Sequence, residues 1–263
     1  MMLSKKVAII YGASGAVGSA VARAFAREGA SVFVTGRRQA PLEALAQEIL
    51  RGGGAAHPEV VDALDENAVA AHLREVVARA GRVDISFNAL GIPQTGIQGT
   101  PLTALTLESF TRPLDTYLRA HFITARAAGR QMTEQRGGVI LMHTPEPARL
   151  GVPLVGGMGP MWAALEALAR FLSTELAPFG VRAVCLRSTG LPETATIDEV
   201  FGIHAKVLGI DVEQFRSLVE SRTHRRRSTS LAELADAAVF AASDRGAALT
   251  GTTLNLTGGL AVD

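Results

Sequence analysis

The sequence predicts an α/β fold: a Rossmann-type, doubly wound sheet of seven parallel strands in the order 3-2-1-4-5-6-7. Short β-rich runs alternate with longer helical runs, and a glycine-rich turn follows the first strand. No linker, repeat or low-complexity stretch divides the 263 residues. Such alternation implies parallel strands joined by right-handed crossovers. We therefore expect a single domain over residues 1–263, a normal size for this fold class.

The strands and helices are expected in strict order along the chain. The predicted strands are residues 7–11, 31–35, 59–61, 83–87, 139–143, 181–186 and 252–256. The predicted helices are residues 16–28, 41–50, 66–79, 106–135 with a disruption near Pro113, 161–176, two short helices within 196–222, and one after Ser230. Asp65 is a candidate N-cap, and Ser230 with Glu233 fits a capping box.

Composition narrows the class of protein. Hydrophobic residues make up 48% of the chain and charged residues 19%, and the formal net charge is +1. A near-neutral chain argues against nucleic-acid partners, so the basic cluster at residues 222–227 is interpreted as a solvated loop or an intersubunit salt-bridge patch. No signal peptide and no membrane span of roughly 18 apolar residues is seen. We expect a cytoplasmic protein with Cys185 as a buried strand thiol and no metal site.

The turn after the first strand has the residues of a dinucleotide site. Tyr11 is followed by Gly12-Ala13-Ser14-Gly15-Ala16-Val17-Gly18, and then by a predicted helix. Small residues let the backbone approach a pyrophosphate, and the helix start offers free N–H groups and a positive dipole end. The placement between strand and helix makes the glycine pattern specific.

The end of the second strand favours NADP(H) over NAD(H). Arg37 and Arg38 stand where an NAD site usually has an acidic residue for the ribose hydroxyls, and no Asp or Glu occurs between Ser31 and Leu42. Arginine offers a planar, multidentate donor set for a 2′-phosphate.

Over nearly its whole length the chain resembles the short-chain dehydrogenase/reductase family. The family's Thr-Gly-x-x-x-Gly-x-Gly motif appears as Tyr11, Gly12, Ala16 and Gly18, and its Asn-Asn-Ala-Gly motif as residues 88–91. Asp62, Thr250-Gly251 and Gly258-Gly259 match further family positions. The resemblance implies these cofactor-binding residues: Gly12, Ser14, Gly15, Ala16, Val17, Gly18, Arg37, Arg38, Asp62, Ala63, Asn88, Ala89, Leu90, Gly91, Ser188, Leu191 and Thr194.

The family's catalytic residues are not found at their expected positions. The serine pair after strand five falls on Thr144-Pro145, the tyrosine on Met158, the lysine on Trp162 and the helix-four asparagine on Tyr117. A second register resembles the enoyl-acyl carrier protein reductases and places the tyrosine on Val155 and the lysine again on Trp162. The chain holds two tyrosines, Tyr11 and Tyr117, and three lysines, Lys5, Lys6 and Lys206. The usual acid–base mechanism is therefore not expected.

Three functions stay open. The first is an atypical NADPH-dependent oxidoreductase that transfers hydride to an apolar C=N, C=C or C=O substrate. The second is a non-catalytic NADP(H)-binding protein, acting as a pseudoenzyme, partner subunit or sensor, and the third is a non-redox reaction with a structural nucleotide. For the first, the candidate catalytic residues are Tyr117, His143, Thr144, Met158 and Trp162. Each of these residues could instead have a purely structural role, such as packing in the core or in a subunit interface. The same choice between a catalytic and a structural role applies to His121 and Glu146.

Residues at about 191–228 occupy the place of the family's substrate lid. They are rich in Ile197, Val200, Phe201 and Phe215, which indicates an apolar substrate or a contact with a second subunit. His204 and Lys206 are polar members of this segment. The family commonly forms tetramers, so the resemblance implies a homo-oligomer, either a tetramer or a dimer.

Overall fold

Seven parallel strands form one sheet in the predicted order, β3-β2-β1-β4-β5-β6-β7. The structure is a computed structural model that describes residues 1–262. The strands are β1 (Val7–Tyr11), β2 (Ser31–Gly36), β3 (Ala55–Val60), β4 (Ile85–Asn88), β5 (Gly138–Pro145), β6 (Val181–Ser188) and β7 (Thr252–Leu256).

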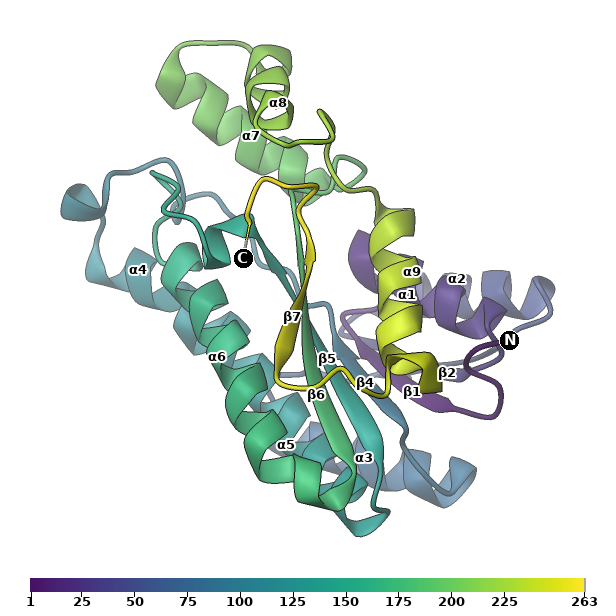
Figure 1. Ribbon diagram of the computed structural model, residues 1–263. Helices are drawn as coiled ribbons and strands as arrows, with labels where there is room; N and C mark the ends of the chain where they lie inside the picture. Colours follow the sequence, from purple (N-terminus) through teal and green to yellow (C-terminus); the bar gives the residue numbers. More distant parts are fainter. Residues whose placement is uncertain (263) are drawn as a thin grey trace.

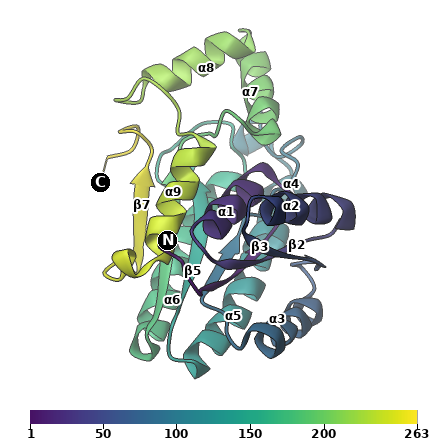
Figure 2. The same ribbon diagram turned by 90° about the vertical axis from the view of Figure 1, so that its right-hand side faces the viewer.

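Helices cover both faces of the sheet (Figures 1 and 2). One face carries α1 (Ala16–Arg27), α2 (Gln39–Arg51) and α9 (Leu231–Ala242); the other carries α3 (Glu66–Ala80), α5 (Arg119–Glu134) and α6 (Met158–Leu176). The remaining helices, α4 (Leu107–Pro113), α7 (Ala195–Leu208) and α8 (Val212–Ser221), lie toward the carboxyl ends of the strands. In both views α7 and α8 project beyond the sheet.

Strand β1 shows why the sheet needs two helical layers. All five of its residues are buried. Ala8 and Ile10 belong to the apolar core under α1 and α9, whereas Val7, Ile9 and Tyr11 belong to the core under α3 and α5. Successive side chains of a strand point to opposite faces, so a continuous apolar run requires cover on both sides.

The predicted start signals for helices are confirmed. The Asp65 carboxylate accepts hydrogen bonds from Asn67 N (2.9 Å) and Ala68 N (3.0 Å) at the start of α3. Ser230 and Glu233 form the expected capping box on α9. Such caps satisfy backbone donors that have no partner within the helix, and each contributes about 1 kcal/mol.

Most elements begin or end within one to three residues of the expected positions, and two larger differences have a clear physical reason. The third strand was expected at residues 59–61 but runs over Ala55–Val60, because it lies at the edge of the sheet, where Pro58 and partly exposed residues are tolerated. The fourth predicted helical region, residues 106–135, is divided near Pro113 as expected, but through a π-helical segment, Leu114–Leu118, which lies between α4 and α5. Proline lacks the backbone N–H that a regular helix uses, so the helix changes its pattern there.

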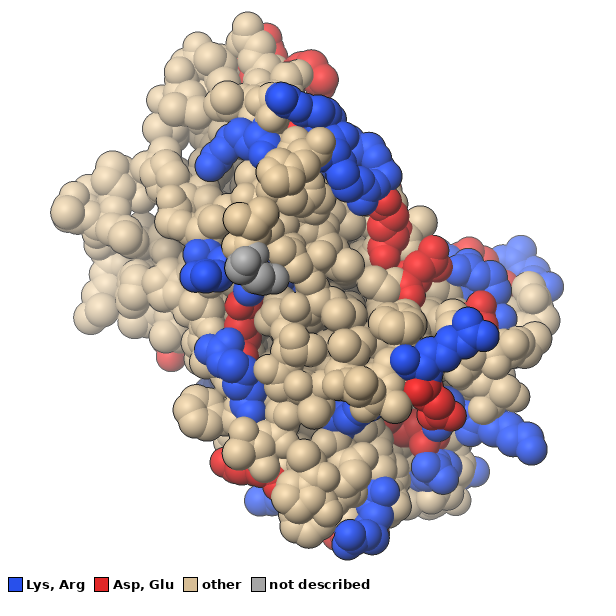
Figure 3. Space-filling view, viewed as in Figure 1, with Lys and Arg blue, Asp and Glu red and all other residues tan. Residues whose placement is uncertain are grey.

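The basic cluster at residues 222–227 contributes ion pairs within the chain. Arg225 and Arg227 both contact Glu233 of α9. Figure 3 shows basic side chains gathered over the segment between α8 and α9, with acidic side chains next to them. Across residues 1–262, none of the helices combines the length and apolar character needed to span a bilayer.

A buried histidine lies beneath the β2–β3 edge. His72 of α3 is 5% exposed, and its ring is 6.3 Å from the ring centroids of both Tyr11 and Phe33. Burial, assisted by the nearby Arg79 guanidinium, lowers the pKa of His72 to about 4. The folded protein therefore disfavours the protonated imidazole at this position.

His72→Gln should flatten the pH dependence of stability between about pH 6.5 and pH 4. In this window the unfolded wild-type chain protonates His72 and the folded chain does not, so acid lowers the free energy of unfolding. The slope of the free energy of unfolding against pH should be smaller in the variant by up to roughly 1.4 kcal/mol per pH unit, which corresponds to the uptake of one proton on unfolding. Urea titrations across this range measure the slope, and the exposed His224→Gln serves as the control. Equal slopes for wild type and His72→Gln would contradict the assignment.

Candidate active site

A cavity of about 390 Å³ opens beside the carboxyl ends of the strands, beneath α7 and α8. This is a typical volume for a small-molecule site, and the carboxyl edge is where open α/β sheets bind their ligands. Its walls come from the glycine-rich turn, the loop after β4, the end of β5, the start of α6 and the segment after β6. The site residues among them include Gly15, Ala16, Val17, Ala89, Leu90, Gly91, Tyr117, His143, Met158, Trp162, Leu191 and Thr194.

The glycine-rich turn is packed too tightly for side chains at two positions. Gly12 has φ +73°, and a Cβ there would lie 2.9 Å from the backbone of Ala89 and Leu90. A Cβ on Gly18 would lie 2.5 Å from the carbonyl oxygen of Gly12. This packing brings the start of α1 to the cavity wall, where no side chain caps it. The bare backbone and exposed helix start fit the pyrophosphate of a dinucleotide.

The end of β2 presents two cations to solvent. Arg37 and Arg38 are both exposed, directly after the buried Gly36, and neither forms an ion pair with the described residues. Ser14 lies next to them, since a Cβ on Gly36 would be 3.5 Å from the Ser14 hydroxyl oxygen. The turn after β1 and the end of β2 therefore form one continuous surface with positive charge at its outer end.

Polar residues at the ends of β3 and β4 shape the adjoining loops. Asp62, next to the buried Ala63, accepts a hydrogen bond from Leu64 N (3.0 Å). Asn88 donates to the Thr124 hydroxyl oxygen (3.0 Å) and accepts from Leu90 N (3.0 Å). The amide of Asn88 thereby orients the cavity-lining residues 89–91.

At the end of β5, consecutive side chains point to opposite faces. His143 and Pro145 line the cavity, but Thr144 does not. Thr144 instead donates to Glu166 of α6 (2.9 Å) within the interior. The structure therefore separates Thr144 from the other four candidate catalytic residues, Tyr117, His143, Met158 and Trp162.

A buried ion pair lies behind this wall. Arg187 of β6 donates through Nε (2.7 Å) and one terminal nitrogen (2.6 Å) to the two oxygens of Glu166. Their side chains are only 5% and 6% exposed. With Thr144, these contacts join β5, β6 and α6 behind the cavity wall.

Tyr117 and His121 stack on one side of the helical region, as expected from their spacing. Their ring centroids are 4.7 Å apart with a 16° angle between the planes. His121 Nδ1 lies 2.9 Å from the Tyr117 carbonyl oxygen and donates to it. Burial lowers the pKa of His121 to about 4 and raises that of Tyr117 well above its usual range. Tyr117 lines the cavity, whereas His121 is one layer deeper.

The hydrogen bonds of His143 define its tautomer. Ser188 donates its single hydroxyl proton to the Thr189 carbonyl oxygen (2.7 Å), so it accepts from His143 Nε2 (2.9 Å). Burial, with a smaller contribution from His121, lowers the pKa of His143 to about 4. His143 is therefore a neutral imidazole that donates through Nε2. Ser188 itself is fully buried and does not line the cavity.

The lid segment and the loop after β4 hold each other over the cavity. One oxygen of Glu199 in α7 accepts from Gln94 N (3.0 Å), Thr95 N (2.8 Å) and the Thr95 hydroxyl (2.7 Å). Thr194 caps α7 by accepting from Ile197 N (3.3 Å). The cavity side of both lid helices is mainly apolar and includes Ile197, Val200, Phe201, Leu208, Phe215, Leu218 and Val219.

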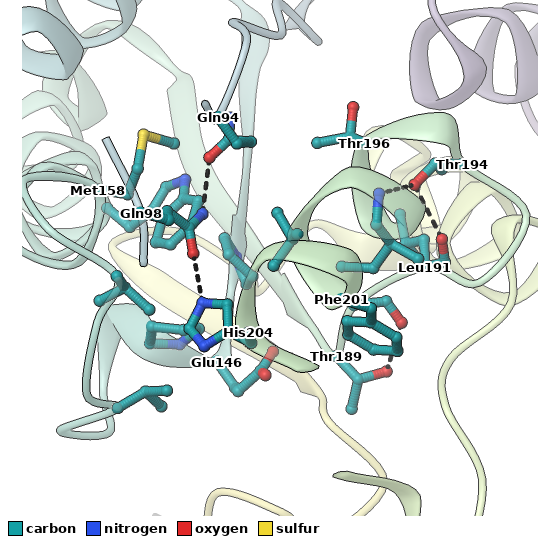
Figure 4. A pocket seen from close by; sticks show the side chains of 18 of the residues that line it. Gln94, Gln98, Glu146, Met158, Thr189, Leu191, Thr194, Thr196, Phe201 and His204 are labelled. Carbon is teal, nitrogen blue, oxygen red and sulfur yellow. Dashed lines mark hydrogen bonds between the residues drawn. The ribbon is translucent and has the colours of Figure 1, made fainter. Parts of the chain in front are cut away.

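Three polar residues form a hydrogen-bonded chain along one wall, shown in Figure 4. Gln94 donates to the Ile92 carbonyl oxygen (2.6 Å), Gln98 donates to Gln94 (2.7 Å), and His204 Nε2 donates to Gln98 (3.0 Å). The Ile92 carbonyl oxygen can only accept, so Gln94 must turn its NH₂ group toward it and its amide oxygen toward Gln98. Gln98 in turn directs its amide oxygen toward His204 Nε2, which therefore carries the proton. The other ring nitrogen, His204 Nδ1, is left as an acceptor. Burial lowers the pKa of His204.

Sequence reasoning did not identify Gln94, Gln98 or Arg222 as cavity residues. Gln94 and Gln98 lie in an irregular loop, where hydrophobic periodicity carries no information. Arg222 was interpreted as part of a surface cluster. The flanking prolines of Glu146 indicated a rigid position near the site, and the structure places Glu146 in the cavity wall.

Known proteins match this chain over nearly its whole length. The family model described as Enoyl-(Acyl carrier protein) reductase matches residues 12–261. L-rhamnose 1-dehydrogenase (NAD(P)(+)) of Azotobacter vinelandii is 32% identical and aligns over 100% of this chain and 99% of its own length.

Solved structures match over nearly the whole chain as well. NAD+-bound xylitol dehydrogenase has a TM-score of 0.91 at 25% identity, covering 98% of this chain and 100% of its own. A gluconate 5-dehydrogenase from Burkholderia cenocepacia, in complex with NADP and tartrate, has a TM-score of 0.86 at 27% identity, covering 99% and 97%. These likenesses extend over the glycine-rich turn, the cavity and the lid segment.

Glu166→Ala should lower the free energy of unfolding by about 3–5 kcal/mol, because it leaves the buried Arg187 guanidinium without this carboxylate. Chemical denaturation measures the loss. The double variant Glu166→Leu/Arg187→Met, which removes both charges, should recover a large part of it. The exposed Glu134→Ala is the surface control. A loss below about 1 kcal/mol for Glu166→Ala, as for a surface ion pair, would contradict the role given to this pair.

Proposed function

Because the chain belongs to the short-chain dehydrogenase/reductase family, we propose that it is an atypical NADPH-dependent oxidoreductase acting on an apolar C=N, C=C or C=O substrate. One observation carries the proposal: a surface that fits a dinucleotide leads directly into an apolar cavity closed by α7 and α8. When bound, NADPH would supply a hydride to a substrate in that cavity. The protein's residues would bind, orient and exclude water.

Each part of the dinucleotide has a candidate partner in this chain. Gly12, Gly18 and the start of α1 would hold the pyrophosphate. Asp62 and Asn88 would contact the adenosine and the ribose, or would order the loops along which these groups lie. Ser188, Leu191 and Thr194 would define the nicotinamide end, with Thr194 and Leu191 in the cavity wall and Ser188 acting through His143.

The preference for NADP(H) rests on Arg37 and Arg38. The xylitol dehydrogenase structure holds NAD+ and the gluconate 5-dehydrogenase structure holds NADP, so relatives of similar fold are found with either nucleotide. Here two exposed guanidinium groups follow β2 without an ion-pair partner among the described residues. A 2′-phosphate would find two charge-assisted donors there.

The substrate end of the cavity is apolar at the positions that align with the family's tyrosine and lysine. Met158 and Trp162 line it, and no lysine is among its described lining residues. Tyr117 and His143 add polar groups that are neutral near pH 7. An iminium or a conjugated enone needs less acid assistance than a ketone during hydride attack, so such substrates suit this lining.

Substrate-dependent oxidation of NADPH tests the proposal. We expect turnover with at least one member of a panel of apolar cyclic imines, conjugated enones and aryl ketones, followed at the absorbance of NADPH. Tight NADPH binding without turnover across the panel would contradict it and favour the non-catalytic NADP(H)-binding alternative. Calorimetry on the same sample supplies the binding measurement.

Arg37→Ala/Arg38→Ala should weaken NADPH binding by about tenfold or more, since each charge-assisted hydrogen bond contributes about 1.5–3 kcal/mol. NADH binding should change by less than about twofold, because NADH lacks the 2′-phosphate. Binding is measured by calorimetry with both nucleotides, and the exposed pair Arg225→Ala/Arg227→Ala is the control. Equal weakening for NADH and NADPH would rule out recognition of the 2′-phosphate by these residues.

A further inference from the structure

Glu146 is an acid with an incomplete set of hydrogen bonds in the cavity wall. It follows Pro145 at the end of β5 and begins a short 3-10 turn, with Pro147 next to it. Its Oε2 atom is sealed from solvent and has no hydrogen-bond partner among the described residues. Figure 4 shows the carboxyl group among the side chains that line the cavity. A buried oxygen without a partner is costly, so it indicates a group that gains its partner from a ligand.

The protonation of Glu146 is set by its surroundings. Burial raises its pKa to about 7, while its own backbone N–H and the Arg222 guanidinium act in the opposite direction. Arg222 is exposed at the rim, where solvent screens its charge, and burial prevails. Near neutral pH a large fraction of Glu146 is therefore protonated, and the carboxyl group can donate its proton within an apolar site.

The other titratable groups around the cavity do not compete for this role. They are Tyr117, His143, His204 and Arg222. Burial keeps Tyr117 protonated and His143 and His204 neutral near pH 7, and an arginine stays charged. His204 Nδ1, fixed as an acceptor by Gln98, adds a second group that can receive a hydrogen bond from a ligand N–H.

We propose that Glu146 protonates the nitrogen of an apolar imine and that the resulting carboxylate pairs with the iminium cation. This inference rests on the proposed function and narrows its substrate class to C=N. The carboxyl O–H bond breaks, the N–H bond forms, and the positive charge on nitrogen faces the negative carboxylate. Reduction to the amine then takes only the hydride of the proposed function, and Glu146 regains a proton from solvent. Such a substrate needs no tyrosine acid.

The test measures proton release when an amine binds in the cavity. The probe is 2-phenylpyrrolidine, a cyclic amine that binds as a cation, and the control ligand is the neutral 2-phenyltetrahydrofuran. Calorimetry in buffers of different ionisation enthalpy gives the protons released, on the full chain with and without NADP+. Trp162, the one tryptophan of the sequence, lines the cavity and reports its occupancy by fluorescence.

With wild type, amine binding at about pH 6.5 should release roughly three quarters of a proton, because the cation drives Glu146 to its carboxylate form. Glu146→Gln should release none and should bind the amine about tenfold or more weakly. Both proteins should bind the neutral ether equally. Glu134→Gln, on an exposed residue at the far end of α5, should behave as wild type. Thermal unfolding confirms that the variants are folded.

The outcomes separate this inference from the proposed function. No proton release by wild type, or equal amine affinity of wild type and Glu146→Gln, would overturn the role of Glu146 even if ketones or enones are reduced. Proton release that depends on Glu146, together with no turnover of any imine, enone or ketone of the panel, would support the cation site and contradict the oxidoreductase. Reduction of imines that collapses in Glu146→Gln supports both.

Discussion

A single buried carboxylate, that of Glu166, holds together the three elements on which the cavity depends. It accepts from Thr144 of β5 and Arg187 of β6 while itself belonging to α6. Its two partners lie on neighbouring parallel strands, at positions that are paired in register. Because an unpaired charge in this environment is expensive, the carboxylate and its donors restrict α6 to one position against the sheet. That position places Met158 and Trp162 opposite the end of β5.

The same strand geometry explains why adjacent residues serve different purposes. Along β5 the side chain of Thr144 supports the scaffold, while those of His143 and Pro145 face the cavity. The turn at Glu146 then carries a carboxyl group into the wall. Because alternate residues of the strand face opposite sides, one set can hold the strand in place while the other set faces the cavity. The contacts that fix the strand are then not exposed in the cavity.

Desolvation is the dominant electrostatic effect around the cavity. It favours the uncharged forms of His121, His143, His204, Tyr117 and Glu146. A pocket lined in this way gives little stabilisation to an anionic oxygen, as formed on a ketone during reduction, unless a proton arrives with the hydride. Hydride transfer to an iminium instead cancels a positive charge on the substrate. In the proposed role, the Glu146 carboxylate pairs with that charge until the hydride arrives, so that the iminium is not left unpaired in the apolar pocket.

The sequence by itself determined the sheet, its strand order, the glycine-rich turn and the helix starts at Asp65 and Ser230, since periodicity, small residues and caps act over a few neighbouring positions. It was less informative at the edge strand β3, where exposure weakens the apolar pattern. Only the tertiary structure decided that Thr144 faces Glu166 and that Gln94, Gln98, Glu146, His204 and Arg222 meet in one cavity. Those contacts join residues up to 106 positions apart, and no local propensity encodes which long-range partners the packing brings together.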